Sequence, residues 1–266
     1  MSTAAILRGE VRCARKVMLR DPMAVFVTVV LPLLYLFIFA TMNGTVNGKL
    51  ATMHMRGQPG ILKVQAYVVA SVIVIGVVSA AFTYLAAQLV RDREDGILKR
   101  LRSAPVRTSI FLAGPVINGT AASLTLAVLV AALGRLGYAV SLPASHLLAA
   151  VVTVITGALA FCALGCLVTV VIRSATAAMP LLFAVTLALF FLSGNFFTTD
   201  SAPAAWRAVA DVFPVRHFLT AMITAYNPHV TGAGFAPRDL AILALWGLAS
   251  AIVAARTFRW TPVRAG

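Results

Sequence analysis

The chain has 266 residues, of which 61% are hydrophobic and 11% are charged. Soluble proteins have about 45–50% apolar and about 25% charged residues, so this composition excludes a soluble globule and indicates a membrane protein. Lysine and arginine number 22 against 8 acidic residues, for a net charge of +14, and the distribution of this charge decides whether nucleic acid is a partner.

The first predicted element is an amphipathic helix over residues 3–20. At helical spacing Leu7, Val11 and Met18 fall on one side, and the arginines and the lysine fall on the other. Such a helix lies in the headgroup layer of a bilayer, with its cations close to anionic lipid. The alternative is a solvated basic tail.

Six apolar runs follow, and each is long enough to cross a bilayer as a helix. They contain no acidic, basic or histidine residue and cover 24–42, 66–90, 110–133, 147–172, 175–197 and 240–255. Strands of a membrane barrel would instead alternate apolar and polar residues. We therefore expect an all-α integral membrane protein with a single transmembrane domain over residues 1–266.

The positive charges predict the orientation of these runs. Fifteen of the 22 lysines and arginines fall on the side that holds both chain ends. Cytoplasmic segments carry the excess of lysine and arginine in membrane proteins, so both termini are expected in the cytoplasm. Most of the net charge is explained by topology, and nucleic acid is not an expected partner.

The segment 91–105, between the second and third runs, combines charge with an apolar stripe. Ile97, Leu98 and Leu101 repeat at helical spacing among basic and acidic residues, and Pro105 closes the segment. A short helix of this kind suits the groove of a soluble partner. The alternative is a charged loop that only sets topology, but topology requires neither acids nor an apolar stripe.

Residues 198–239, before the sixth run, are too apolar for a simple loop. They include Trp206, Phe213, Phe218 and Tyr226. We expect two short helices, about 204–212 and 216–226, that dip back toward the membrane, which is permitted where protein or a wet cavity covers the backbone. The alternative is a pair of interfacial helices with no role in a pathway.

Several functions lack their signatures. None of the four lysines precedes serine or threonine, which excludes a P-loop. The runs hold no carboxylate, which disfavours an ion-coupled carrier or a channel, and no cluster of the acids and histidines that a membrane enzyme needs. The cysteines and histidines lack metal-ligand spacing, and the histidines are expected to be solvated. We therefore predict no catalytic and no metal-binding residue.

Neutral polar side chains inside the runs are candidates for a translocation path. We single out Ser79, Thr83, Gln88, Ser193 and Asn195. The alternative is that such groups bond to a nearby backbone carbonyl.

The order of elements resembles that of the permease subunit of type-2 ATP-binding-cassette transporters, especially the daunorubicin/doxorubicin-type exporters. The most specific part begins at Arg93-Glu94-Asp95-Gly96 and ends at Pro105, and is similar to the family's R-E-x-G-x-L-x-x-L-x-x-x-P stretch, which contributes the coupling helix. A second part, Leu192 to Phe197, is similar to L-S-G-x-F-F-P, with Thr198 in place of the proline. No arginine ends the second short helix.

The resemblance implies two permease subunits, as identical copies or paralogues, each docked to an ATP-binding subunit. The residues that it assigns to this coupling are Arg93, Glu94, Gly96, Ile97, Leu98 and Leu101, with a second contact at Arg173. No cofactor is expected in this chain, because ATP and magnesium bind the partner.

The implied activity is ATP-driven export of hydrophobic or amphipathic drugs or lipids across a bacterial plasma membrane. Export of a lipid-linked glycan is the alternative within this class. A multi-span membrane enzyme is the alternative from a different class.

Overall fold

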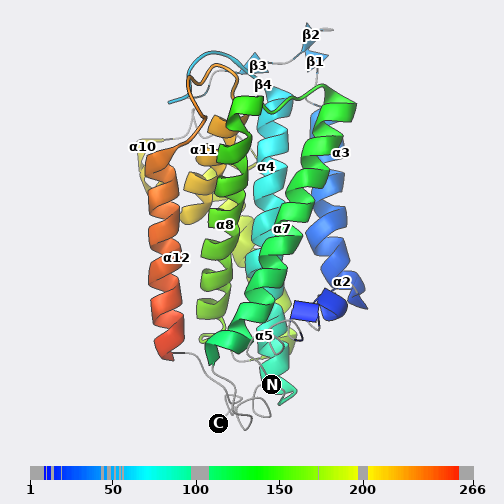
Figure 1. Cartoon of the computed structure of the whole chain (residues 1–266), viewed down its shortest axis with the longest axis vertical. Coiled ribbons are helices and arrows are strands. Elements are labelled where there is room, and N and C mark those ends of the chain that lie inside the picture. Colours follow the sequence, from blue (N-terminus) through cyan, green and yellow to red (C-terminus); the bar gives the residue numbers. More distant parts are fainter. Residues whose placement is uncertain are drawn as a thin grey trace.

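A computed structural model gives the architecture of the chain. It describes residues 9, 11–12, 15–18, 20–42, 45–46, 49–50, 52–53, 55, 57–96, 108–172, 174–196 and 203–257. Long helices run side by side in one elongated bundle (Figure 1), so the all-α membrane fold is confirmed. We call the end of the bundle where α5 and α12 finish the α5 end, and the opposite end the hairpin end.

Five helices are long and apolar enough to cross a membrane, and a shorter apolar helix spans Phe26–Met42. In chain order the elements are α2 (Pro22–Val25), the π-helix η1 (Phe26–Val30), α3 (Leu31–Met42), α4 (Val64–Val78), the π-helix η2 (Ser79–Tyr84), α5 (Leu85–Glu94), α7 (Thr108–Tyr138), the 3-10 turn η3 (Ala144–His146), α8 (Leu147–Val168), α9 (Ala175–Ser193), α10 (Ala204–Ala210), α11 (Pro214–Tyr226) and α12 (Pro237–Thr257). Two small antiparallel hairpins, β1 (Thr45–Val46) with β2 (Lys49–Leu50) and β3 (Thr52–Met53) with β4 (Leu62–Lys63), cover the hairpin end.

The first helix ends at Met42, as its apolar run does, but the later helices do not end where their runs end. The second helix continues to Glu94 because Gln88, Arg91 and Asp92 bond to one another along it, at the spacing that stabilises helices. The fourth helix stops at Val168, short of the expected residue 172, and the fifth stops at Ser193, where Gly194 adopts a left-handed conformation (φ 84°). The third and sixth helices extend beyond the expected bounds at both ends.

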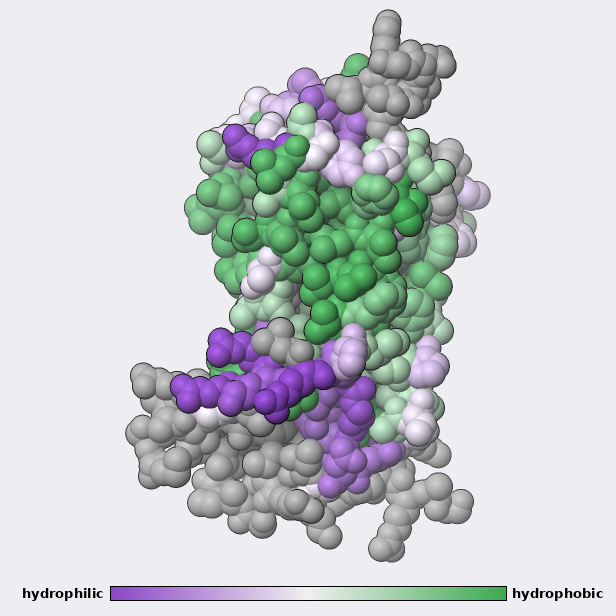
Figure 2. All heavy atoms as spheres, turned by 90° about the vertical axis from the view of Figure 1, so that its right-hand side faces the viewer, coloured by the Kyte–Doolittle hydropathy of each residue, from purple (hydrophilic) through white to green (hydrophobic). Residues whose placement is uncertain are grey.

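α4, η2 and α5 form one continuous helix, which we call the central helix, and it occupies the middle of the bundle (Figure 1). Every side chain from Gln65 to Tyr84 is buried. The other membrane-crossing helices surround it and expose apolar residues outward. One side view shows these as a continuous hydrophobic belt, with hydrophilic residues beginning toward the α5 end (Figure 2), as expected for a protein that lipid surrounds.

The N-terminal segment is helical at the residues that the structure describes between positions 9 and 20. Met18 is buried against Tyr84 of the central helix, and its sulfur accepts a hydrogen bond from Asn118 of α7. The basic side chains Arg12, Arg15, Lys16 and Arg20 are exposed. This distribution places one apolar contact on the bundle and the cations on the surface, in agreement with the amphipathic pattern.

α10 and α11 lie where the two short helices were expected. Pro203 and Pro214 precede or open them, which suits proline because the first turn of a helix leaves its N–H groups unpaired. α11 is buried along most of its length between α4, α8 and α12, and its Phe218 ring is fully enclosed. This helix is therefore part of the core at the hairpin end.

Candidate functional site: the contacts between α9 and the central helix

At the α5 end, Arg93 of the central helix reaches the end of α8. Its side chain is only 2% exposed. One guanidinium nitrogen donates to the carbonyl oxygen of Thr169 at 2.7 Å, and the other donates to that of Ile172. Both carbonyls follow the last turn of α8, where backbone oxygens lack helical partners and carry partial negative charge. Arg93 therefore binds the turn that follows α8.

The next residue, Glu94, binds the beginning of α9. Its carboxylate accepts a hydrogen bond from the backbone N–H of Ala175 at 2.7 Å. Ser174, the residue before α9, makes no capping hydrogen bond with its own side chain, so Glu94 supplies the cap from a different helix. A carboxylate at this position also complements the positive end of the helix dipole.

Two adjacent residues of opposite charge thus hold the two sides of the α8–α9 turn. Gly96 follows in a left-handed conformation (φ 71°), which glycine adopts without a steric penalty. The other residues that the resemblance assigns to coupling, Ile97, Leu98, Leu101 and Arg173, lie outside the described residues.

Near the middle of the bilayer-spanning region, a hydroxyl pair joins the same two helices. The oxygens of Thr83 on η2 and Thr186 on α9 are 2.9 Å apart and buried. Beside this pair lies a cavity of about 50 Å³ between η1, α3, η2 and α9. Ser79, Thr83, Thr186 and Tyr35 contribute hydroxyl-bearing side chains to an otherwise apolar wall. Both π-helices line it, and π-helices occur frequently at functional sites.

At the hairpin end, the last residues of α9 are bound from several helices. Tyr67 of α4 donates to the carbonyl oxygen of Gly194, and Asn195 donates to that of Ser71 at 3.1 Å. Tyr35 of α3 donates to the carbonyl oxygen of Asn195 at 3.4 Å. Arg216 of α11 donates to Ser193 in the same way at 3.3 Å. Three of these bonds satisfy carbonyl groups at or just beyond the end of α9, where a helix leaves them unpaired.

The five candidate path residues therefore fall into two groups. Ser79 and Thr83 line the cavity. The other three are engaged in holding helices: Gln88 bonds along α5, Ser193 donates to Leu189 within α9, and Asn195 is fully buried against α4.

The expectation that the histidines are solvated is wrong for two of them. His146 is buried, with Nδ1 3.0 Å from the carbonyl oxygen of Ala225 on α11. His217 is buried between Asp239 of α12 and the carbonyl oxygen of Asp211. Among the described residues, no group of three potential metal ligands occurs.

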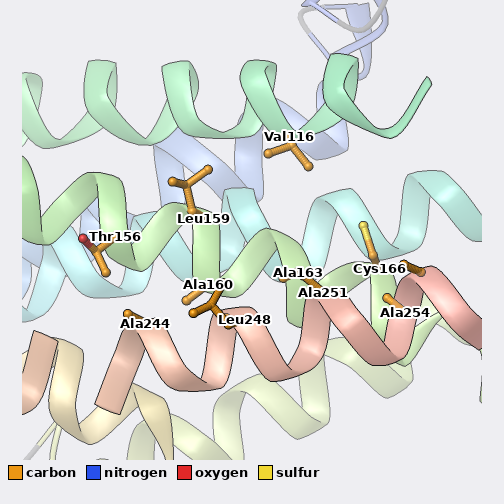
Figure 3. Close-up of a pocket in the computed structure, with 12 residues that line it drawn as sticks. Val116, Thr156, Leu159, Ala160, Ala163, Cys166, Ala244, Leu248, Ala251 and Ala254 are labelled. Carbon is orange, nitrogen blue, oxygen red and sulfur yellow. The ribbon is translucent and has the colours of Figure 1, made fainter. Parts of the chain in front are cut away.

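A second, larger space lies on the lipid-facing side of the bundle. It is an apolar groove of about 500 Å³ along α8 and α12, with Val116 of α7 at one wall (Figure 3). Small residues bring the two helices together: an added Cβ on Gly247 would lie 3.0 Å from the Cα of Ala160. Small-residue ridges of this kind permit close packing of membrane helices.

The family model that describes the ABC-2 type transporter matches residues 9–226. The chain belongs to the ABC-2 type transporter family. No curated protein matches it. The match includes the central helix, α9 and α11, and so contains all three sets of contacts described above. The protein is thus a multi-pass permease subunit of an ABC transporter, and members of this family typically work with an ATP-binding subunit.

Proposed function

We propose that this ABC-2 permease exports hydrophobic or amphipathic compounds, drugs or lipids, from a bacterial cell, driven by ATP that a separate subunit hydrolyses. Both termini and the α5 end would lie in the cytoplasm, where the apolar stripe of the segment 91–105 (Ile97, Leu98 and Leu101) and the turn at Arg173 meet the ATP-binding subunit. A second permease copy or a paralogue would complete the transporter.

The observation that carries the proposal is the chemistry of the cavity between α3, η2 and α9. Its walls are aliphatic and aromatic, its few polar groups are hydroxyls, and none of the described residues that line it is charged. Binding sites for small organic molecules typically combine an apolar wall with a few polar groups. At about 50 Å³ the cavity holds one or two waters, so cargo would enter only when α9 and α3 separate.

The same lining argues against a lipid-linked glycan as the cargo. The phosphate linkage of such a molecule calls for a cationic side chain, and the part of the chain that the structure describes places none on the cavity wall. We therefore favour uncharged or weakly charged amphipathic compounds.

Transport by the reconstituted complex tests the proposal. The chain is co-expressed with a candidate ATP-binding subunit, and inside-out vesicles are assayed for ATP-dependent uptake across a panel of drugs and fluorescent lipids. We expect uptake of at least one amphipathic compound. The absence of ATP-dependent uptake for every compound would contradict the proposal.

Two variants show whether the cavity contacts the cargo. Ser79→Ala with Thr83→Val removes two hydroxyls from its wall and should raise the KM for uptake about tenfold. Thr120→Val on α7 is the matched control, because the Thr120 hydroxyl donates to Val116 of its own helix and does not line the cavity. An equal KM in all three proteins would exclude this cavity as the cargo site.

A further inference from the structure

Three sets of polar contacts join the central helix to α9 along the whole length of the bundle. They are Glu94 with Ala175 at the α5 end, Thr83 with Thr186 in the middle, and α4 with Gly194 and Asn195 at the hairpin end. Thr83 precedes Glu94 by the same number of residues by which Thr186 follows Ala175. The two helices therefore run antiparallel in matched register.

Apart from these contacts and the bonds from Tyr35 and Arg216, few of the described residues restrain α9. It packs mainly against η2 and α5, with smaller contacts to α10 and α11, and most of its apolar side chains face outward. Leu181, Val185 and Phe191 are examples of these exposed residues. Displacing the central helix while its polar contacts persist must therefore displace α9 as well.

From these contacts we propose that Arg93 and Glu94 are positioning residues that hold the central helix and α9 together as one rigid body. This inference rests on the proposed function, because the rigid body would carry movement of residues 97–105 to the hairpin end. In this arrangement the two residues do not bind the ATP-binding subunit. They make the α8–α9 turn follow the segment that does.

The burial of Arg93 supports a positioning role over a docking role. Its guanidinium already donates to two carbonyl oxygens and is 2% exposed, so it cannot reach a docked protein without leaving Thr169 and Ile172. A buried cation without partners is strongly unfavourable, so Arg93 remains bound to these two carbonyl oxygens. Glu94 is exposed, but its bond to Ala175 commits one carboxylate oxygen to α9.

A distance measurement on the chain alone tests whether Arg93 and Glu94 hold α9 against the central helix. Asp95→Cys places one spin label at the end of α5, and Ala177→Cys places another in the first turn of α9; both positions are exposed. Both changes are made in a Cys13→Ser background, in which the remaining Cys162 and Cys166 are buried. We expect a narrow distance distribution that broadens when Arg93→Gln or Glu94→Gln is added. Arg256→Gln, at an exposed arginine in the last turn of α12, is the matched control, because it removes a cation at the same end of the bundle from a different helix. An unchanged distribution in both Gln variants would overturn the proposal.

A second measurement separates positioning from docking in the assembled transporter. For Glu94→Gln, which keeps the size of the side chain at an exposed position and should fold normally, we expect unchanged co-purification of the ATP-binding subunit and ATP hydrolysis within about twofold. Transport per ATP should fall about tenfold or more. Loss of co-purification would overturn the proposal in favour of direct docking, and unchanged transport per ATP would overturn it outright.

The two measurements also separate this proposal from the proposed function. If the unmodified complex transports no compound, the proposed function fails. The distance distributions still decide whether Arg93 and Glu94 hold α9 against the central helix.

Discussion

His217 on α11 lies with its Nδ1 2.7 Å from a carboxylate oxygen of Asp239 in the first turn of α12. Its Nε2 lies 2.8 Å from the carbonyl oxygen of Asp211, so both ring nitrogens face acceptors. A histidine donates from both nitrogens only when it is protonated. The hydrogen bond to Asp239 raises the pKa of His217, while burial opposes that effect.

This pair predicts a pH-dependent stability of the hairpin end. Since the pKa of His217 is raised in the folded protein, its stabilising contribution is complete below the ordinary histidine pKa of about 6.5. That contribution is lost as the pH rises through the raised value. We expect the melting temperature in detergent to fall across this window and the fall to be absent in His217→Gln. His229→Gln, at an exposed histidine beyond α11, should retain it.

The hydroxyl pair in the middle of the bundle predicts an energetic coupling between η2 and α9. Hydrogen bonds between membrane helices contribute about 0.6 kcal/mol and reach about 1.7 kcal/mol. A double-mutant cycle of Thr83→Val and Thr186→Val should therefore give a coupling free energy of about 0.5–1.5 kcal/mol in reversible unfolding from bicelles. Thr83→Val paired with Thr120→Val, whose hydroxyl bonds within α7, should give none.

The space around two glycines, Gly157 on α8 and Gly137 on α7, predicts opposite effects of substitution by alanine. An added Cβ on Gly157 would lie 2.7 Å from the buried ring of Phe218, so Gly157→Ala should destabilise the protein by about 1–3 kcal/mol. Gly137, near the end of α7, is exposed and has no atom within 4 Å of that position. Gly137→Ala should be neutral or stabilise by about 0.5–1 kcal/mol. Equal unfolding free energies for the two variants would contradict the packing.

The proposed orientation predicts which end of the bundle a membrane-impermeant maleimide reaches in intact cells. Asp95→Cys reports on the α5 end and Thr231→Cys on the hairpin end, and both positions are exposed. In a Cys13→Ser background, only Thr231→Cys should react with intact cells, and Asp95→Cys should react after permeabilisation. Labelling of Asp95→Cys in intact cells would reverse the orientation.

Local sequence signals were sufficient for the class of fold and for the two short helices. Long apolar runs predict membrane helices because lipid forces the backbone to bond within each segment. The two short helices were expected at about 204–212 and 216–226, and α10 and α11 occupy Ala204–Ala210 and Pro214–Tyr226. The ends of the long helices were less predictable, because hydropathy marks contact with lipid, whereas Arg91 and Asp92 extend the helix through bonds between side chains.

The contacts of the candidate site were not predictable from local patterns. A charged residue beside a coupling motif is expected to face outward, yet Arg93 faces inward because α8 ends beside it and leaves carbonyl groups unpaired. The burial of His146 and His217 depends in the same way on carbonyl groups from distant segments. The sequence singled out Ser79 and Thr83, but only the fold brings Thr186 to them.

The π-helix η2 has a consequence for how the central helix can vary in length. A π-turn accommodates an extra residue in a helix, and each residue of an α-helix accounts for about 100° of rotation about the axis. With η2 between them, Tyr67 and Ser71 on one side and Glu94 on the other all reach α9. Deletion of one residue within Ser79–Tyr84 would convert the π-turn into an ordinary α-turn and leave both halves of the central helix facing α9. Deletion of one residue elsewhere in the central helix would turn one half against the other by about 100° and release α9 at one end.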